Sequence, residues 1–160
     1  VESINPQDLA LQANNPAIAR NMRDVFPHPY TIENARHFLD LAGQKLVRHV
    51  FGIFENETFI GIGSIIPQTD IHRMNAEIGY WIGESYWGKG YVTEAVRLLV
   101  RYAFDELKLI RVYASVFESN KASMRVLEKS GFHLEVIIKS GIIKNDVVID
   151  EYLYSTQNPA

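Results

Sequence analysis

Residues 80–95 read Tyr-Trp-Ile-Gly-Glu-Ser-Tyr-Trp-Gly-Lys-Gly-Tyr-Val-Thr-Glu-Ala, which places a glycine-rich turn between an apolar run and a long amphipathic pattern. Backbone N–H groups at such a turn, where a helix begins, can bind a phosphate. From Val92 to Leu107 apolar residues recur at helical spacing, while Arg97 and Arg101 fall on the opposite face. We therefore predict a phosphate-bearing ligand at the turn and a long helix, starting at Gly88 to Gly90, that packs on a sheet.

The composition narrows the class of protein. A chain of 160 residues that is 47% hydrophobic is long enough for one domain with a core. A net charge of −3 without a basic stripe argues against a nucleic-acid partner. The chain has neither a long apolar run nor a charged leader, so we expect a soluble, cytoplasmic protein with no membrane partner. Without cysteines there is no disulfide or thiol nucleophile, and the five histidines lack metal-ligand spacing, so no metal is expected.

Capping residues and hydrophobic patterns predict the order of the elements. Asn5 and Thr31 are typical helix N-caps, and the second of these helices runs to Gly43. Residues 26–30, Phe-Pro-His-Pro-Tyr, predict a loop between them, because the prolines forbid helix and the aromatic rings suit packing over other residues. After the two helices we expect strands 48–55, 58–67 and 76–82, the long helix, strand 109–117, helix 120–130, and strands 132–139 and 147–154.

Two other phosphate-binding motifs match the turn in part. The dinucleotide fingerprint requires a third glycine where this chain has Thr93, and no acidic residue follows at the expected distance. Residues 83–89 fit the first part of a P-loop, and residues 147–151 imitate its metal-binding strand. However, the P-loop needs Ser or Thr after its lysine to hold magnesium, and this chain has Gly90 there. A dinucleotide site and a P-loop are therefore less favoured alternatives for this turn.

Three successive segments resemble signatures of the GNAT superfamily of acyl-CoA-dependent N-acetyltransferases. They are Ala-Glu-Ile-Gly-Tyr-Trp-Ile-Gly at 76–83, Trp-Gly-Lys-Gly-Tyr-Val-Thr-Glu-Ala at 87–95 and Asn-Lys-Ala-Ser-Met-Arg-Val-Leu-Glu-Lys-Ser-Gly-Phe at 120–132. They are most similar to the branch of ribosomal-protein-alanine acetyltransferases, as are residues 14–16 and 26–30. The resemblance implies one α+β acetyltransferase domain over residues 1–160. Its mixed, mostly antiparallel sheet has six to seven strands flanked by about four helices, and Val1 to Ile4 would be the remnant of a first strand.

The resemblance also implies an activity. Acetyl-CoA would be the acyl donor, and the favoured acceptor is the α-amine of a protein N-terminus. Other members of this fold acetylate small amines such as polyamines or aminoglycosides, and fold does not decide the substrate. A module that binds acyl-CoA without turnover is a further alternative, and a homodimer is compatible with the resemblance.

Acetyl transfer from a thioester to an amine needs a neutral amine, a polarised carbonyl and a stabilised thiolate. Glu77 can accept the amine proton, although it could also be a solvent-facing residue or an ion-pair partner of Arg73. Asn120 can contact the pantetheine amide or merely cap its helix, and Ser123 can donate to the thiolate or bond a nearby carbonyl. Backbone N–H groups at residues 81–83 can line the pantetheine arm, and one can donate to the oxyanion.

This sequence departs from the superfamily at two positions. Ser85 stands where many members have Gln or Arg, and Leu127 stands where many have the tyrosine that protonates the thiolate. The branch resembled suggests Ser123 as the replacement acid. The candidate set is therefore Glu77 and Ser123 for catalysis; Trp81, Ile82, Gly83, Trp87, Gly88, Lys89, Gly90, Tyr91, Val92, Thr93, Asn120 and Ser123 for the cofactor; and Phe26, His28 and Tyr30 for the acceptor.

Overall fold

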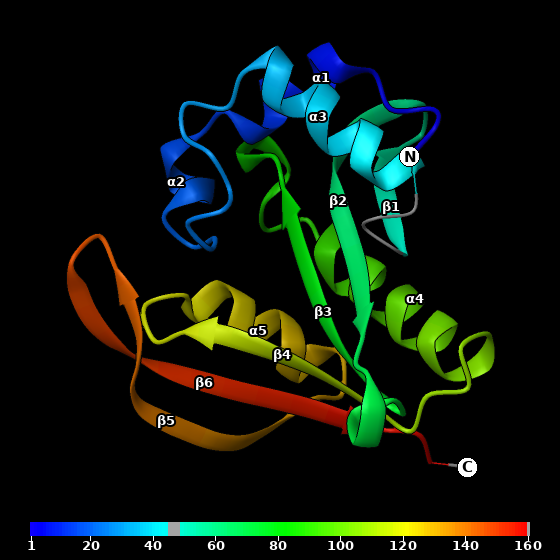
Figure 1. Cartoon of the computed structure of the whole chain (residues 1–160), viewed down its shortest axis with the longest axis vertical. Coiled ribbons are helices and arrows are strands. Elements are labelled where there is room, and N and C mark those ends of the chain that lie inside the picture. The colour runs from blue at the N-terminus through cyan, green and yellow to red at the C-terminus, as the bar shows by residue number, and fades with distance from the viewer. Residues whose placement is uncertain (45–48, 160) are drawn as a thin grey trace. The chain divides into compact units, whose positions relative to one another are not determined.

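A mixed six-stranded sheet runs through the computed structural model, which describes residues 1–44 and 49–159 (Figure 1). Its strands are β1 (Val50–Glu55), β2 (Thr58–Pro67), β3 (Asn75–Ile82), β4 (Arg111–Phe117), β5 (His133–Lys144) and β6 (Val147–Gln157). They are arranged in the order β1-β2-β3-β4-β6-β5, with β3 and β4 parallel and the pairs β1/β2, β4/β6 and β5/β6 antiparallel. The predicted α+β class with a mostly antiparallel sheet is confirmed.

The described residues form five α-helices, where the sequence predicts about four. They are α1 (Pro6–Ala13), α2 (Pro16–Ala19), α3 (Ile32–Gly43), α4 (Tyr91–Asp105) and α5 (Lys121–Lys129), with 3-10 turns at Asp70–His72 and Glu84–Tyr86. The helix missing from the prediction is α2, whose single turn is too short for a periodic pattern and begins with the Asn15 side chain accepting the Ala17 N–H at 2.8 Å. Within these residues no helix is long and apolar enough to span a membrane.

Val1 to Ile4, which the sequence suggests as the remnant of a first strand, do not form a strand. These residues form a turn in which the Ile4 N–H donates to the Val1 carbonyl at 3.0 Å. The Ile4 side chain is buried in the core, so its apolar character serves packing rather than a strand. The predicted start of the next strand at Arg48 lies outside the described residues, and β1 begins at Val50.

The chain divides into two compact units that exchange segments. The first contains residues 1–64 and 80–91, and the second contains residues 65–79 and those from 92 onward. Strands β2 and β3 and helix α4 therefore each contribute residues to both units.

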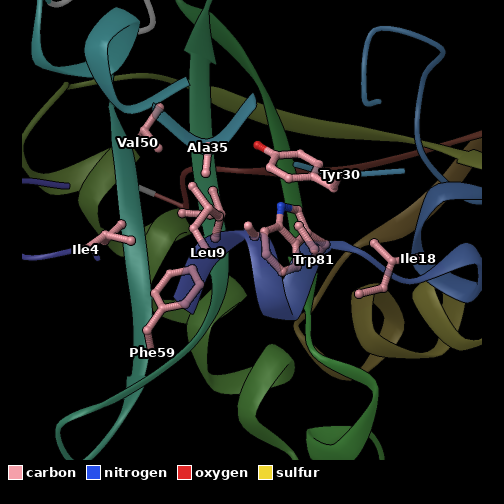
Figure 2. Packing of buried hydrophobic residues seen from close by; sticks show 11 residues of the cluster. Ile4, Leu9, Ile18, Tyr30, Ala35, Val50, Phe59 and Trp81 are labelled. Carbon is pink, nitrogen blue, oxygen red and sulfur yellow. The ribbon is translucent and has the colours of Figure 1, made fainter. Parts of the chain in front are cut away.

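The first unit has a core made by α1, α3, β1, β2 and the end of β3. Figure 2 shows Leu9 and Tyr30 close to the Trp81 indole, and the Phe26 ring adds a contact to Trp81 with centroids 6.0 Å apart. Leu9 is fully buried, and burying such a side chain stabilises a fold by roughly 1.5–3 kcal/mol. Gly61 lets β2 approach β3 closely, because a Cβ there would lie 2.3 Å from the Trp81 carbonyl oxygen.

The second unit is built on β4 and the long hairpin of β5 and β6, drawn in orange and red in Figure 1. Val112, Ala114 and Val116 are buried on one face of β4, as strand alternation requires. On the other face the Arg111 guanidinium bonds Glu135 of β5, and Ser155 of β6 donates to the same carboxylate at 2.6 Å. These bonds lower the pKa of Glu135, with the Arg111 contact having the largest effect.

Candidate functional site

The turn that precedes α4 has the backbone conformation that a phosphate site requires. Gly88 and Gly90 have φ angles of +73° and +86°, which residues with a Cβ rarely adopt. A Cβ built at either glycine would meet nothing within 4 Å, so packing does not explain the glycines. The turn is exposed, and the N–H groups that follow it open α4, where the first turn of a helix leaves its donors without intrahelical partners. An anion can therefore approach the main chain here.

Side chains brace this turn at both ends. The Trp87 indole Nε1–H donates to the Ile82 carbonyl at 2.9 Å, and the Tyr91 hydroxyl donates to the Glu55 carboxylate. The Tyr86 and Tyr91 rings meet edge to face at 6.3 Å, and the Lys89 ammonium lies 5.4 Å from the centre of the Tyr86 ring. Sequence reasoning missed Glu55, because a partner 36 residues from Tyr91 leaves no local signal.

The end of β3 limits which main-chain donors can face a ligand. The Gly83 N–H donates to the Ile60 carbonyl at 2.8 Å, so this donor already has a partner in β2. Because the N–H groups of neighbouring strand residues point to opposite edges, we expect the Ile82 N–H to point away from β2. A Cβ at Gly83 would lie 2.0 Å from the side-chain oxygen of Gln12 in α1, which is the end of a flexible side chain and can move aside.

The loop over residues 26–30 packs as its aromatic residues predict. Tyr30 is 6% exposed, burial raises its pKa to about 12, and its N–H donates to the Asn14 side chain at 3.0 Å. The Phe26 ring lies 5.0 Å from the Tyr30 ring and is half-buried. His28 is exposed. Of the three residues predicted to contact the acceptor, His28 is therefore the most exposed, Phe26 is half-buried and Tyr30 is buried.

In the second unit, Glu77 lies where the pairing of β3 with β4 ends. The register of these fully described strands runs from Asn75 opposite Arg111 to Glu77 opposite Tyr113, although both strands continue further. Glu77 is half-buried and shares a sheet face with Tyr113, while its neighbours Ala76 and Ile78 are buried on the other face. The guanidinium of Arg73, the alternative ion-pair partner, donates to the Asp70 carbonyl at 3.1 Å.

Helix α5 places the two remaining candidates at its N-terminus. Asn120 caps the helix, because its side-chain oxygen accepts the Ser123 N–H at 3.2 Å. Ser123 is half-buried one turn into the helix. Leu127, where many superfamily members carry the acid, is fully buried, so this side chain belongs to the core. A larger phenol at 127 would overpack that core.

The predicted residues therefore fall into two groups. The first unit contains the turn, the end of β3 and the aromatic loop, and the second contains Glu77, Val92, Thr93, Asn120 and Ser123. The Thr93 carbonyl accepts the Ser130 hydroxyl at 3.4 Å, which ties α4 to the end of α5. Within residues 1–44 and 49–159, no group of three or more histidine, aspartate or glutamate side chains is arranged to hold a metal ion.

Comparison with known proteins gives one family. Residues 2–133 match the acetyltransferase (GNAT) domain. A probable N-acetyltransferase of Bacillus subtilis, YjcK, is 40% identical over 135 residues, which cover 81% of this chain and 75% of the relative. The putative ribosomal N-acetyltransferase YdaF of the same organism is 33% identical over 143 residues, covering 89% and 73%. The crystal structure of the microcin C7 self-immunity acetyltransferase MccE with acetyl-CoA and AMP superposes with a TM-score of 0.82 at 25% identity, covering 96% of this chain and 87% of that one.

Proposed function

The chain belongs to the GNAT family and is an acetyl-CoA-dependent N-acetyltransferase, and we propose that its acceptor is the α-amine of a protein N-terminus. The name of the relative YdaF, a putative ribosomal N-acetyltransferase, supports this acceptor class. The observation that carries the donor site is the exposed turn with two positive-φ glycines before α4. We further propose that residues 1–160 act as a single catalytic domain. That this domain forms a homodimer stays a prediction.

The turn is the proposed site for the pyrophosphate of acetyl-CoA. The N–H groups of residues 88–93 would donate to the phosphate oxygens, and the Lys89 ammonium would add charge. The side chains of Trp87 and Tyr91 would hold the turn in place. At the end of β3, the Ile82 N–H would bond the pantetheine arm as an added strand does, next to Trp81 and Gly83. In the second unit, Asn120 is a further proposed contact of the cofactor and remains the cap of α5.

Glu77 is the proposed general base. Its carboxylate would take a proton from the acceptor ammonium, directly or through water, so that the neutral nitrogen can attack the thioester carbonyl. The carbon–nitrogen bond forms, the oxyanion accepts a main-chain hydrogen bond, and the carbon–sulfur bond then breaks. The Ser123 hydroxyl would donate to the departing thiolate. The attacking nitrogen loses its second proton as the amide forms, and the thiolate takes up that proton, directly or through the hydroxyl or water, to end as the CoA thiol.

The role of Ser123 gives a direct prediction. Ser123→Ala removes the hydroxyl but keeps the N–H that Asn120 accepts, so the cap should survive. We expect turnover at saturating acetyl-CoA to fall by about 10- to 100-fold, with the dissociation constant for CoA changed less than about threefold. Steady-state kinetics and calorimetry measure the two quantities. Ser123→Thr, which keeps a hydroxyl, is the control and should retain most of the activity. Full activity in the alanine variant would return Ser123 to a structural role.

The acceptor is tested with a panel of amines. The protein is incubated with acetyl-CoA and peptides with free N-termini, N-terminally blocked peptides containing lysine, polyamines or aminoglycosides, and thiol release and product mass are followed. We expect the free N-terminal peptides to be acetylated with the highest kcat/KM. A preference for polyamines or aminoglycosides would replace the proposed acceptor with a small amine. Tight acetyl-CoA binding without turnover on any amine would favour a module that only binds acyl-CoA.

A further inference from the structure

We infer that the Tyr91–Glu55 hydrogen bond positions the phosphate turn, so that a side chain of β1 sets the affinity for acetyl-CoA through Tyr91. The inference rests on the proposed donor site. Both residues lie in the first unit, Tyr91 as the first residue of α4 and Glu55 as the last residue of β1. Both side chains are half-buried, and the Tyr91 hydroxyl donates to the Glu55 carboxylate.

The turn needs such a brace because of its own composition. Gly88 and Gly90 have no side chains, and glycine loses more conformational freedom than any other residue when it is fixed. No atom lies within 4 Å of a Cβ built on either glycine, so packing does not hold the turn in place. A turn that is already fixed loses less conformational entropy when a ligand binds, so the ligand binds more tightly.

The neighbouring contacts transmit the position of Tyr91 to the turn. The centroids of the Tyr91 and Tyr86 rings lie 6.3 Å apart, and the Lys89 ammonium lies over the Tyr86 ring, 5.4 Å from its centroid. At the opposite end, the Trp87 indole holds the Ile82 carbonyl. The turn is thus fixed to β3 at its start and to β1 at its end, and Tyr91→Phe removes the second attachment alone while it keeps the ring.

The test measures donor binding and kinetics in Tyr91→Phe and Glu55→Leu. We expect each variant to raise the CoA dissociation constant, and the KM for acetyl-CoA, by about tenfold, with kcat within about twofold of the parent. S-acetylpantetheine lacks the pyrophosphate, so its kcat/KM should not change. The double variant should bind CoA with the same affinity as either single variant, because both substitutions remove the same hydrogen bond.

Two controls separate positioning from general damage. Glu55→Gln keeps an oxygen that accepts the Tyr91 hydroxyl and should retain CoA affinity within about twofold. Glu57→Gln removes an exposed carboxylate from the same hairpin and should change nothing. Equal losses with acetyl-CoA and S-acetylpantetheine, or a Tyr91→Phe variant that binds CoA normally, would overturn the inference. If the parent protein itself binds no CoA, the donor site fails instead, and the two failures are distinct.

Discussion

Glu77→Gln is expected to lower turnover by about 10²- to 10⁴-fold at neutral pH, with little change in CoA affinity, because loss of a general base costs that range. Glutamine has nearly the same shape but cannot accept the amine proton. Glu77 is the last residue of β3 that pairs with β4, and its side chain is half-buried. The binding control is calorimetry with CoA. Glu106→Gln, which removes an exposed carboxylate elsewhere in the second unit, should leave turnover unchanged.

The pH dependence of this variant depends on the acceptor. Without a base, only amine that is already neutral in solution reacts, so the rate rises as pH approaches the pKa of the amine. An N-terminal α-amine titrates near pH 7.7–8.0 and a lysine-like amine near 10.4. Between pH 7 and about pH 9 the rate of the variant should therefore rise roughly tenfold and level off with the first substrate, and should still be rising at pH 9 with the second. Near-normal turnover of Glu77→Gln from about pH 6 to 9 would show that deprotonation occurs elsewhere.

Gly90→Ala is expected to raise the CoA dissociation constant by about 100-fold. The added Cβ would project into the open space through which a phosphate approaches the main chain, and charge-assisted bonds to the backbone would be lost. The positive φ also strains an alanine by roughly 1–2 kcal/mol, so the variant should melt at a lower temperature as well. Calorimetry with CoA and a thermal melt measure the two effects.

Gly131→Ala is the matched control for this strain. Gly131 follows the end of α5, has a φ of +87°, and likewise has nothing within 4 Å of its Cβ direction. The two variants should therefore lose similar stability, while only Gly90→Ala loses CoA affinity. Normal CoA binding by a folded Gly90→Ala variant would remove the phosphate site from this turn.

Local sequence signals predicted most of the fold. Asn5 and Thr31 do cap helices, and the long periodic pattern after Gly90 does form α4, because caps and amphipathic spacing act within a few residues. The short helix α2 and the turn at Val1 to Ile4 escaped because each is too brief to carry a pattern.

The candidate site was predictable to a smaller extent. The glycines of the turn follow from their motif, but the contacts of Glu55 with Tyr91 and of Gln12 with Gly83 join residues far apart in sequence. Such pairs depend on tertiary packing, which a single sequence does not reveal. Leu127 illustrates the same limit, because the sequence marks it as a missing acid whereas the structure gives it a buried packing role.

A single-turnover experiment tests direct acetyl transfer most closely. Enzyme in excess over acetyl-CoA is mixed with a peptide bearing a free N-terminus, quenched at intervals, and analysed by intact mass for both the peptide and the protein. We expect the peptide to gain the mass of one acetyl group at the rate at which the CoA thiol appears, with the protein unmodified at every time. An acetylated protein that forms before the peptide product, or thiol release without acetylated peptide, would contradict it.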